Sequence, residues 1–171
     1  MLDLQTRSEK MENDINELEQ YRRRCCLEFK GIAYEKNENT DQLIVQVANK
    51  LGVTLHPSDI SIFHRMAPST PIHPNPNIIV KFLSCKVRDN IYSKRIKLKL
   101  ANASFQPGHL KVFINESLTK QNRESFKKCN DFKKNIWTKN RLTYLRKDDA
   151  SQTIIIQNNK DLHKFGIAAQ I

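Results

Sequence analysis

The side chains best spaced for chemistry in this sequence are basic ones that recur at helical intervals. In residues 86–99, Arg88, Arg95 and Lys99 fall within ~40° of one another on a helix of 100° per residue. Such a row of cations can bind phosphate oxygens, and arginine does so through two hydrogen bonds at once. The spacing therefore predicts a phosphate-binding stripe on this helix.

Further cations follow on the next predicted elements. Arg123 and Lys127 share a side of a predicted helix over residues 119–134, and four more surround a predicted hairpin: Lys139, Arg141, Arg146 and Lys147. A single basic helix face often does no more than keep a protein in solution. Residues 81–147, however, hold 18 Lys and Arg against four Asp and Glu. This excess favours a polyanionic partner, single-stranded RNA or DNA.

Two tyrosines and a tryptophan lie among these cations. Tyr92, Trp137 and Tyr144 are candidates for stacking on nucleic-acid bases, which every base permits through its flat face. The alternative for each is an ordinary place in a core or in a cross-strand pair. Binding through phosphates and ring faces predicts little sequence preference.

Catalytic patterns are absent from the sequence. Four glycines make no glycine-rich phosphate loop, and Asp148 and Asp149 are adjacent, so their side chains point apart. We therefore expect no enzymatic activity, no cofactor and no metal. Cys25, Cys26, Cys85 and Cys129 form no C-x-x-C pair, which predicts buried, reduced thiols.

The first 24 residues predict an acidic helix. Leu4, Met11, Ile15 and Leu18 are spaced by seven, four and three residues, as in a coiled-coil seam. Two interpretations remain open: the seam joins copies of the chain into a homo-oligomer, or it docks on the rest of the same chain.

The remaining elements predict an α+β fold. Strands at 25–32, 60–65, 77–83 and 112–115 alternate with helices at 39–51 and 86–99 in the order β-α-β-β-α-β, a ferredoxin-like arrangement. A helix at 119–134, strands at 136–138, 142–146 and 153–157, and a short helix near 161–165 form a smaller α+β domain. The expected domains are 1–24, 25–115 and 116–171.

Short sequence segments along the chain resemble those of a known protein family. They include Pro57-Ser58-Asp59-Ile60, Ile79-Val80-Lys81-Phe82 and Val112-Phe113-Ile114-Asn115-Glu116. In order and spacing, over residues 18–162, they resemble the nucleic-acid chaperone proteins encoded by the first reading frame of LINE retrotransposons. The same pattern resembles the baculovirus few-polyhedra (FP) protein and its C-terminal domain.

This resemblance implies a coiled-coil oligomer, a domain like an RNA-recognition motif and a C-terminal domain, with single-stranded nucleic acid in a basic cleft between the last two. It adds Arg65, which follows His64, to the expected contacts. The predicted third strand carries Ile79 and Lys81 on one face and no row of aromatics, so stacking on that sheet is not expected. The alternative implied by FP proteins is an oligomeric protein-interaction or viral structural adaptor.

The expected location is intracellular, in the cytoplasm or the nucleus. No apolar run approaches the ~20 residues that span a bilayer, and the first 18 residues lack the apolar centre of a secretory signal.

Overall fold

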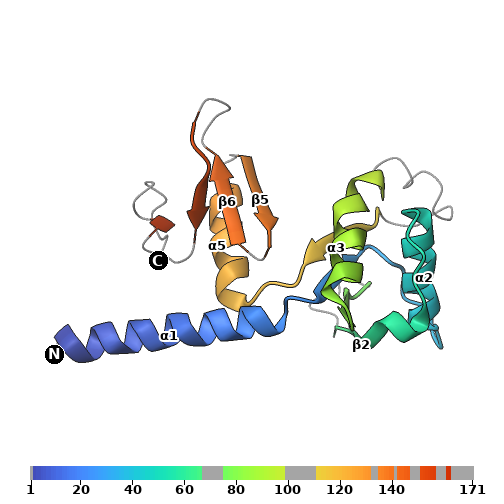
Figure 1. Ribbon diagram of the computed structural model, residues 1–171, viewed down its shortest axis with the longest axis horizontal. Coiled ribbons are helices and arrows are strands. Elements are labelled where there is room, and N and C mark those ends of the chain that lie inside the picture. The colour runs from blue at the N-terminus through green and yellow to red at the C-terminus, as the bar shows by residue number, and fades with distance from the viewer. Residues whose placement is uncertain are drawn as a thin grey trace. The chain divides into compact units, whose positions relative to one another are not determined.

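The computed structural model describes residues 2–66, 75–98, 111–131, 135–140, 142–146, 151–156 and 161–162. It divides the chain into two compact units (Figure 1): residues 25–117 form one, and residues 1–24 together with 118–171 form the other. Residues 67–74 lie outside the described residues, as do Lys99 and the predicted helix end at 132–134.

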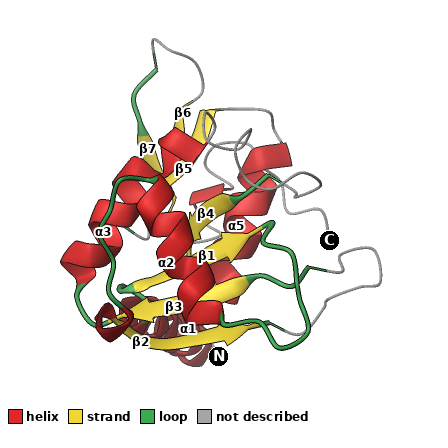
Figure 2. Cartoon of the chain, turned by 90° about the vertical axis from the view of Figure 1, so that its right-hand side faces the viewer, coloured by secondary structure: helices red, strands yellow, loops and turns green. Residues whose placement is uncertain are grey.

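The unit of residues 25–117 is a four-stranded antiparallel sheet with two helices (Figure 2), in the predicted β-α-β-β-α-β order. Its elements are β1 (Cys26–Lys30), α2 (Thr40–Lys50), a 3-10 turn (Pro57–Asp59), β2 (Ile60–Arg65), β3 (Ile78–Phe82), α3 (Cys85–Lys94), a 3-10 turn (Arg95–Lys97) and β4 (Phe113–Glu116). The strands lie in the order β2-β3-β1-β4, so β2 and β4 form the edges.

Local sequence explains where the two helices begin. The side chain of Asn39 accepts a hydrogen bond from the Gln42 amide, and that of Ser84 accepts one from the Lys86 amide. Each thereby satisfies a backbone donor that the first turn of a helix leaves free. The helix α2 ends before Gly52, whose φ of +69° is a conformation that glycine adopts without strain.

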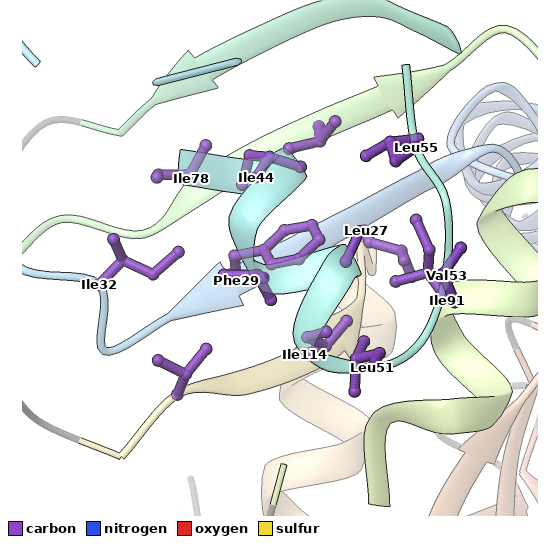
Figure 3. Close-up of a cluster of buried hydrophobic side chains, with 14 of the residues drawn as sticks. Leu27, Phe29, Ile32, Ile44, Leu51, Val53, Leu55, Ile78, Ile91 and Ile114 are labelled. Atoms are coloured by element: carbon purple, nitrogen blue, oxygen red, sulfur yellow. The ribbon is translucent and has the colours of Figure 1, made fainter. Parts of the chain in front are cut away.

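One face of this sheet and the two helices enclose the main core (Figure 3). Leu27 and Phe29 of β1 and Ile78 of β3 are almost completely buried, as are Ile44 of α2 and Ile91 of α3. The period-two alternation of β3 puts Ile78, Val80 and Phe82 inside and leaves Ile79 and Lys81 on the other face.

The other unit combines the N-terminal helix with the C-terminal segment. Its elements are α1 (Leu2–Arg22), α5 (Lys120–Asp131), β5 (Asn135–Lys139), β6 (Leu142–Arg146) and β7 (Ile154–Ile156). The strands form an antiparallel sheet in the order β5-β6-β7. A small core of Cys129, Leu145, Ile156 and Leu162 lies between α5 and this sheet.

Helix α1 lies beside the start of α5 (Figure 1), and a network of polar side chains joins the two. The Thr119 amide and the Asn122 side-chain amide both donate to Oε1 of Gln20, each at 2.9 Å. The Thr119 hydroxyl donates to Oδ1 of Asn16 at 2.7 Å, and Nδ2 of Asn16 donates to Oδ1 of Asn122 at 3.0 Å. Because Gln20 and Thr119 are buried, these bonds replace water at the N-terminus of α5.

The predicted seam of α1 faces away from this network. Leu4, Met11, Ile15 and Leu18 are between 62% and 70% exposed. Around the helix the centre of the seam lies about 150° from the midpoint of Asn16 and Gln20. Within its own unit the seam therefore does not dock on the described residues, because α1 uses polar side chains for that contact.

The expectation of four reduced thiols is also wrong. Cys25 and Cys85 form a disulfide that joins the start of β1 to the start of α3. These residues are 60 positions apart, and sequence spacing carries no sign of the pairing. Cys26 and Cys129 are free and buried, as expected, and burial raises the pKa of the Cys129 thiol.

No helix in the described residues is long and apolar enough to cross a membrane.

Candidate nucleic-acid interface

The sheet β5-β6-β7 has two different faces because alternate residues of a strand point to opposite sides. Strand pairing places Ile136, Leu145 and Ile154 in one row, and these residues pack with Cys129 of α5. The residues between them in sequence therefore lie on the face away from α5. This second face is called the outer face below.

An aromatic row crosses the outer face. Trp137 pairs with Tyr144, which pairs in turn with Ile155. The two rings are stacked, with centroids 5.7 Å apart and planes 9° from parallel. Trp137 and Tyr144 are both partly exposed, and Ile155 is 41% exposed. The cross-strand pair that the sequence offered as the ordinary interpretation is thus present, on the face away from the core.

Cations lie on both sides of this row. Arg146 pairs with Asn135 one row away, and Lys139 pairs with Leu142 on the opposite side. Lys139 is exposed. The guanidinium carbon of Arg146 lies 6.0 Å from the centroid of the Trp137 ring, close enough for a cation–π interaction. We call Lys139, Arg146, Trp137, Tyr144 and Ile155 the outer-face platform.

Arg146 is only partly engaged within the described residues. Its Nη2 donates to the Thr153 hydroxyl at 3.2 Å, and its buried Nε has no hydrogen-bond partner among them. A guanidinium held beside an indole ring can bind a phosphate through charge and hydrogen bonds.

The two predicted contacts on α5 lie on a different element of the same unit. Lys127 is exposed and Arg123 is partly exposed, as is the preceding Asn122. The buried positions of the helix are Ser125 and Cys129, which face the sheet. Arg123 and Lys127 are therefore not part of the platform.

Arg88 does not lie on a solvent-facing stripe, and its assignment as a phosphate contact is corrected. Its side chain is 4% exposed and bonds the 1%-exposed carboxylate of Glu116 at 2.5 Å and that of Asp89 at 2.7 Å. Burial lowers the pKa of Arg88, but hydrogen bonds to Glu116 and Asp89 outweigh burial and raise it. Arg88 therefore forms a buried structural ion pair with Glu116.

The prediction of Arg65 as a nucleic-acid contact is corrected for the same reason. Its five N–H donors are all used. Nε and Nη2 each donate to the Glu38 carboxylate, and Nη2 also donates to the Ala33 carbonyl. Nη1 donates to the carbonyls of Ile32 and Pro76. Arginine has no further donor. Arg65 therefore ties two loops to the end of β2 and has no hydrogen bond left for a ligand.

The remaining predicted residues of this unit are closely associated with each other. The guanidinium carbon of Arg95 lies 3.8 Å from the centroid of the Tyr92 ring, and that of Arg88 lies 4.9 Å from it. Nη1 of Arg95 donates to the Tyr92 carbonyl at 2.8 Å. A base would have to displace Arg95 from this ring face before it could stack there. Of the other predicted contacts, Lys99, Arg141 and Lys147 lie outside the described residues.

Sequence reasoning overlooked Ile155 of the platform, its outer-face neighbour Leu142 and one separate aromatic. Leu142 and Ile155 lie on the outer face and are 37% and 41% exposed, and Phe113 of β4 is 51% exposed in the other unit. The signal for Ile155 was its place between Ile154 and Ile156. In a run of three isoleucines, the middle one must point away from the core that the other two join.

No group of three or more His, Cys, Asp or Glu that could hold a metal ion is present in the part of the chain that the structure describes.

The fold around the platform is a small α+β unit with a basic and aromatic sheet face. Residues 115–166, which span α5 and β5 to β7, match the family model described as Baculovirus FP protein domain 2. This match supports the resemblance to the baculovirus FP protein family, and the resemblance to LINE proteins stays a prediction. No curated protein matches the chain.

Proposed function

We propose that this protein is non-catalytic and binds single-stranded RNA or DNA with little sequence preference. The observation that carries this proposal is the stacked pair of Trp137 and Tyr144 on the outer face, with Lys139 on one side and Arg146 on the other. Aromatic rings beside cations are the combination that proteins use to hold unpaired bases and their phosphates together.

The geometry favours a single strand over a duplex. Successive rows on one face of a strand are about 7 Å apart, so the platform from Arg146 to Lys139 is only about 13 Å long. That length suits a few unstacked nucleotides. In a duplex the base faces are already covered by neighbouring base pairs, and only the phosphates would remain for the two cations.

The strength of binding should depend on salt. Each neutralised phosphate of a single strand contributes about −0.7 to the slope of log affinity against log salt. Lys139 and Arg146, with two to four further cations, give a slope of about −3 to −4. Since contacts are made to phosphates and ring faces, different base sequences should bind with similar affinity.

Fluorescence anisotropy with labelled single strands, titrated from about 50 to 500 mM salt, tests this proposal. Trp137→Leu and Tyr144→Leu keep apolar bulk but remove a stacking face, and each should weaken binding by about 1–3 kcal/mol. Tyr34→Leu is a matched control, because Tyr34 is an exposed tyrosine of the other unit. Equal losses for all three variants would contradict a binding role for the platform.

We also propose that α1 joins copies of the chain through Leu4, Met11, Ile15 and Leu18. These side chains are exposed in the single chain, and the contact with α5 uses the other side of the helix. An oligomer would present several platforms to one strand, which raises apparent affinity without any new contact.

The second candidate is an oligomeric adaptor that binds proteins and has no need of nucleic acid. The family match and the exposed seam of α1 agree with this role as well. The two candidates differ in the salt titration: an adaptor would show no salt-dependent binding to single strands at micromolar concentration.

A further inference from the structure

We propose that the Cys25–Cys85 disulfide is a reversible thiol–disulfide exchange site that takes a small thiol such as glutathione, or a protein dithiol, as its reductant. The proposal concerns the unit of residues 25–117 and does not depend on nucleic-acid binding. Three observations support it: the accessibility of the pair, the position of Cys85 at a helix N-terminus, and the burial of the other two cysteines.

The bond is accessible from solvent. Cys25 and Cys85 are both partly exposed, so an incoming thiolate can approach a sulfur of the bond. Exchange requires that approach, because it proceeds by attack on one sulfur through a mixed disulfide. Their Cα atoms are 4.7 Å apart, within the range of natural disulfides, so the bond can re-form without movement of the backbone.

The two sulfurs differ in how well they leave as thiolates. Cys85 is the first residue of α3, directly after the N-cap Ser84, and Lys86 follows it. The positive end of the helix dipole and a nearby ammonium group both stabilise a thiolate. Cys25 precedes β1 and follows Arg24, so both cysteines have a neighbouring cation in sequence, but Cys25 has no helix N-terminus of its own. Cys85 is therefore the better leaving group.

The exchange follows from this difference. An external thiolate attacks Sγ of Cys25, the bond between the two cysteines breaks, and its electron pair leaves with Sγ of Cys85. A second reductant thiolate then attacks the mixed disulfide and releases Cys25, which takes a proton from water. Two electrons pass to the protein, and the reductant becomes a disulfide.

The other cysteines do not compete in this exchange. Cys26 is 8% exposed and Cys129 is fully buried, so neither offers a thiolate to the bond. We expect the fold to remain after reduction of the disulfide, since the hydrogen bond from the Phe82 amide to the Cys25 carbonyl, at 2.9 Å, still holds the start of β1. Reduction removes a cross-link between positions 60 residues apart.

Alkylation followed by mass spectrometry, on the whole chain in glutathione buffers from oxidising to strongly reducing, tests the proposal. As the buffer becomes more reducing, Cys25 and Cys85 should change together from protected to alkylated, at a reduction potential within the range of intracellular glutathione. Cys26 and Cys129 should stay unmodified. Reduction should lower the thermal midpoint by at least about 5 °C. Alkylation of both residues in every buffer, or protection even in strong reductant, would overturn the proposal.

Single variants test the assignment of the leaving group. In Cys25→Ser the remaining Cys85 thiol should alkylate several times faster at neutral pH than the Cys25 thiol does in Cys85→Ser. The Cys129→Ser variant is the matched control and should leave the redox transition unchanged. The reverse order of rates would overturn the role given to Cys85.

Discussion

Arg65 and Arg88 show why a basic residue does not by itself mark a ligand site. Each has its guanidinium bound by carboxylates of its own unit, Glu38 for the first and Glu116 with Asp89 for the second. A charge that is withdrawn from water needs such partners, because its desolvation costs several kcal/mol. Both guanidinium groups are therefore engaged within the unit of residues 25–117.

The buried pair of Arg88 and Glu116 gives a first prediction. Arg88→Met leaves the Glu116 carboxylate buried without this partner and should lower the free energy of unfolding by about 3–5 kcal/mol. Chemical denaturation measures that change. The double variant Arg88→Met, Glu116→Leu should recover most of it, since no unpaired charge remains. Lys86→Met is an exposed control, and a loss for Arg88→Met no larger than for this control would contradict the structural role.

A second prediction concerns pH. Burial raises the pKa of Glu38, but hydrogen bonds from Arg65 and the Glu35 amide, with the charge of Arg65, outweigh burial and lower it below 4.5. A carboxyl whose pKa is lowered by folding stabilises the fold above its unfolded pKa. That stability is lost as the pH falls through the folded pKa.

Thermal midpoints of the protein and of Glu38→Gln, measured from about pH 7 down to pH 3, test this sign. The protein should be the more stable of the two at pH 7, and the difference should shrink below about pH 4.5. A difference that stays constant over the whole range would show that the Glu38 charge contributes nothing.

At the scale of elements, α1 divides its surface between two tasks. Asn16 and Gln20 bond the start of α5, and the apolar seam lies on the other side of the helix. In the proposed assembly, this separation lets the helix hold the C-terminal segment and meet another copy of the chain at the same time.

The seam gives a third prediction. Ile15→Glu should shift the protein from an oligomer towards the single chain in sedimentation at tens of micromolar, because a charge in a coiled-coil seam must be desolvated. Folding of the single chain should be little affected, since Ile15 is exposed there. Gln5→Glu adds the same charge at another exposed position of α1 and should leave assembly unchanged. A monomer before any substitution would refute the assembly.

Most elements were predictable because their signals are local. Caps at Asn39 and Ser84, and alternation in β3, depend on neighbours within a few residues. The errors came from contacts between distant positions. Helical spacing grouped Arg88 with Arg95. It did not reveal that Arg88 would be buried in an ion pair with Glu116, 28 residues away from it in sequence. The Cys25–Cys85 pairing was hidden for the same reason.

The candidate site was predictable in part. Trp137, Tyr144, Lys139 and Arg146 were all candidates from sequence, and strand pairing brings them to one face. Sequence did not separate them from Arg123 and Lys127, because only the packing of α5 on the opposite face of the sheet does so. Spacing along the chain gives angles within one element, whereas the face that a neighbour covers depends on tertiary structure.

At the scale of the whole molecule, the chain starts and ends in the same unit. The structure groups residues 1–24 with residues 118–171 in one unit, whereas the sequence predicted these segments as separate domains. The seam of α1 and the outer-face platform consequently belong to one body. In an oligomer built through α1, each added copy brings its platform with the helix that assembles it.

Fluorescence emission from Trp137 tests whether the outer-face platform binds single-stranded nucleic acid, because Trp137 is the chain's single tryptophan. Titration with a short single strand at low salt should quench or shift its fluorescence in step with binding followed by anisotropy, and added salt should reverse both signals together. A duplex of the same length should bind without the emission change. Binding of the single strand that leaves Trp137 emission unaltered, or no binding at low salt, would contradict the platform as the nucleic-acid site.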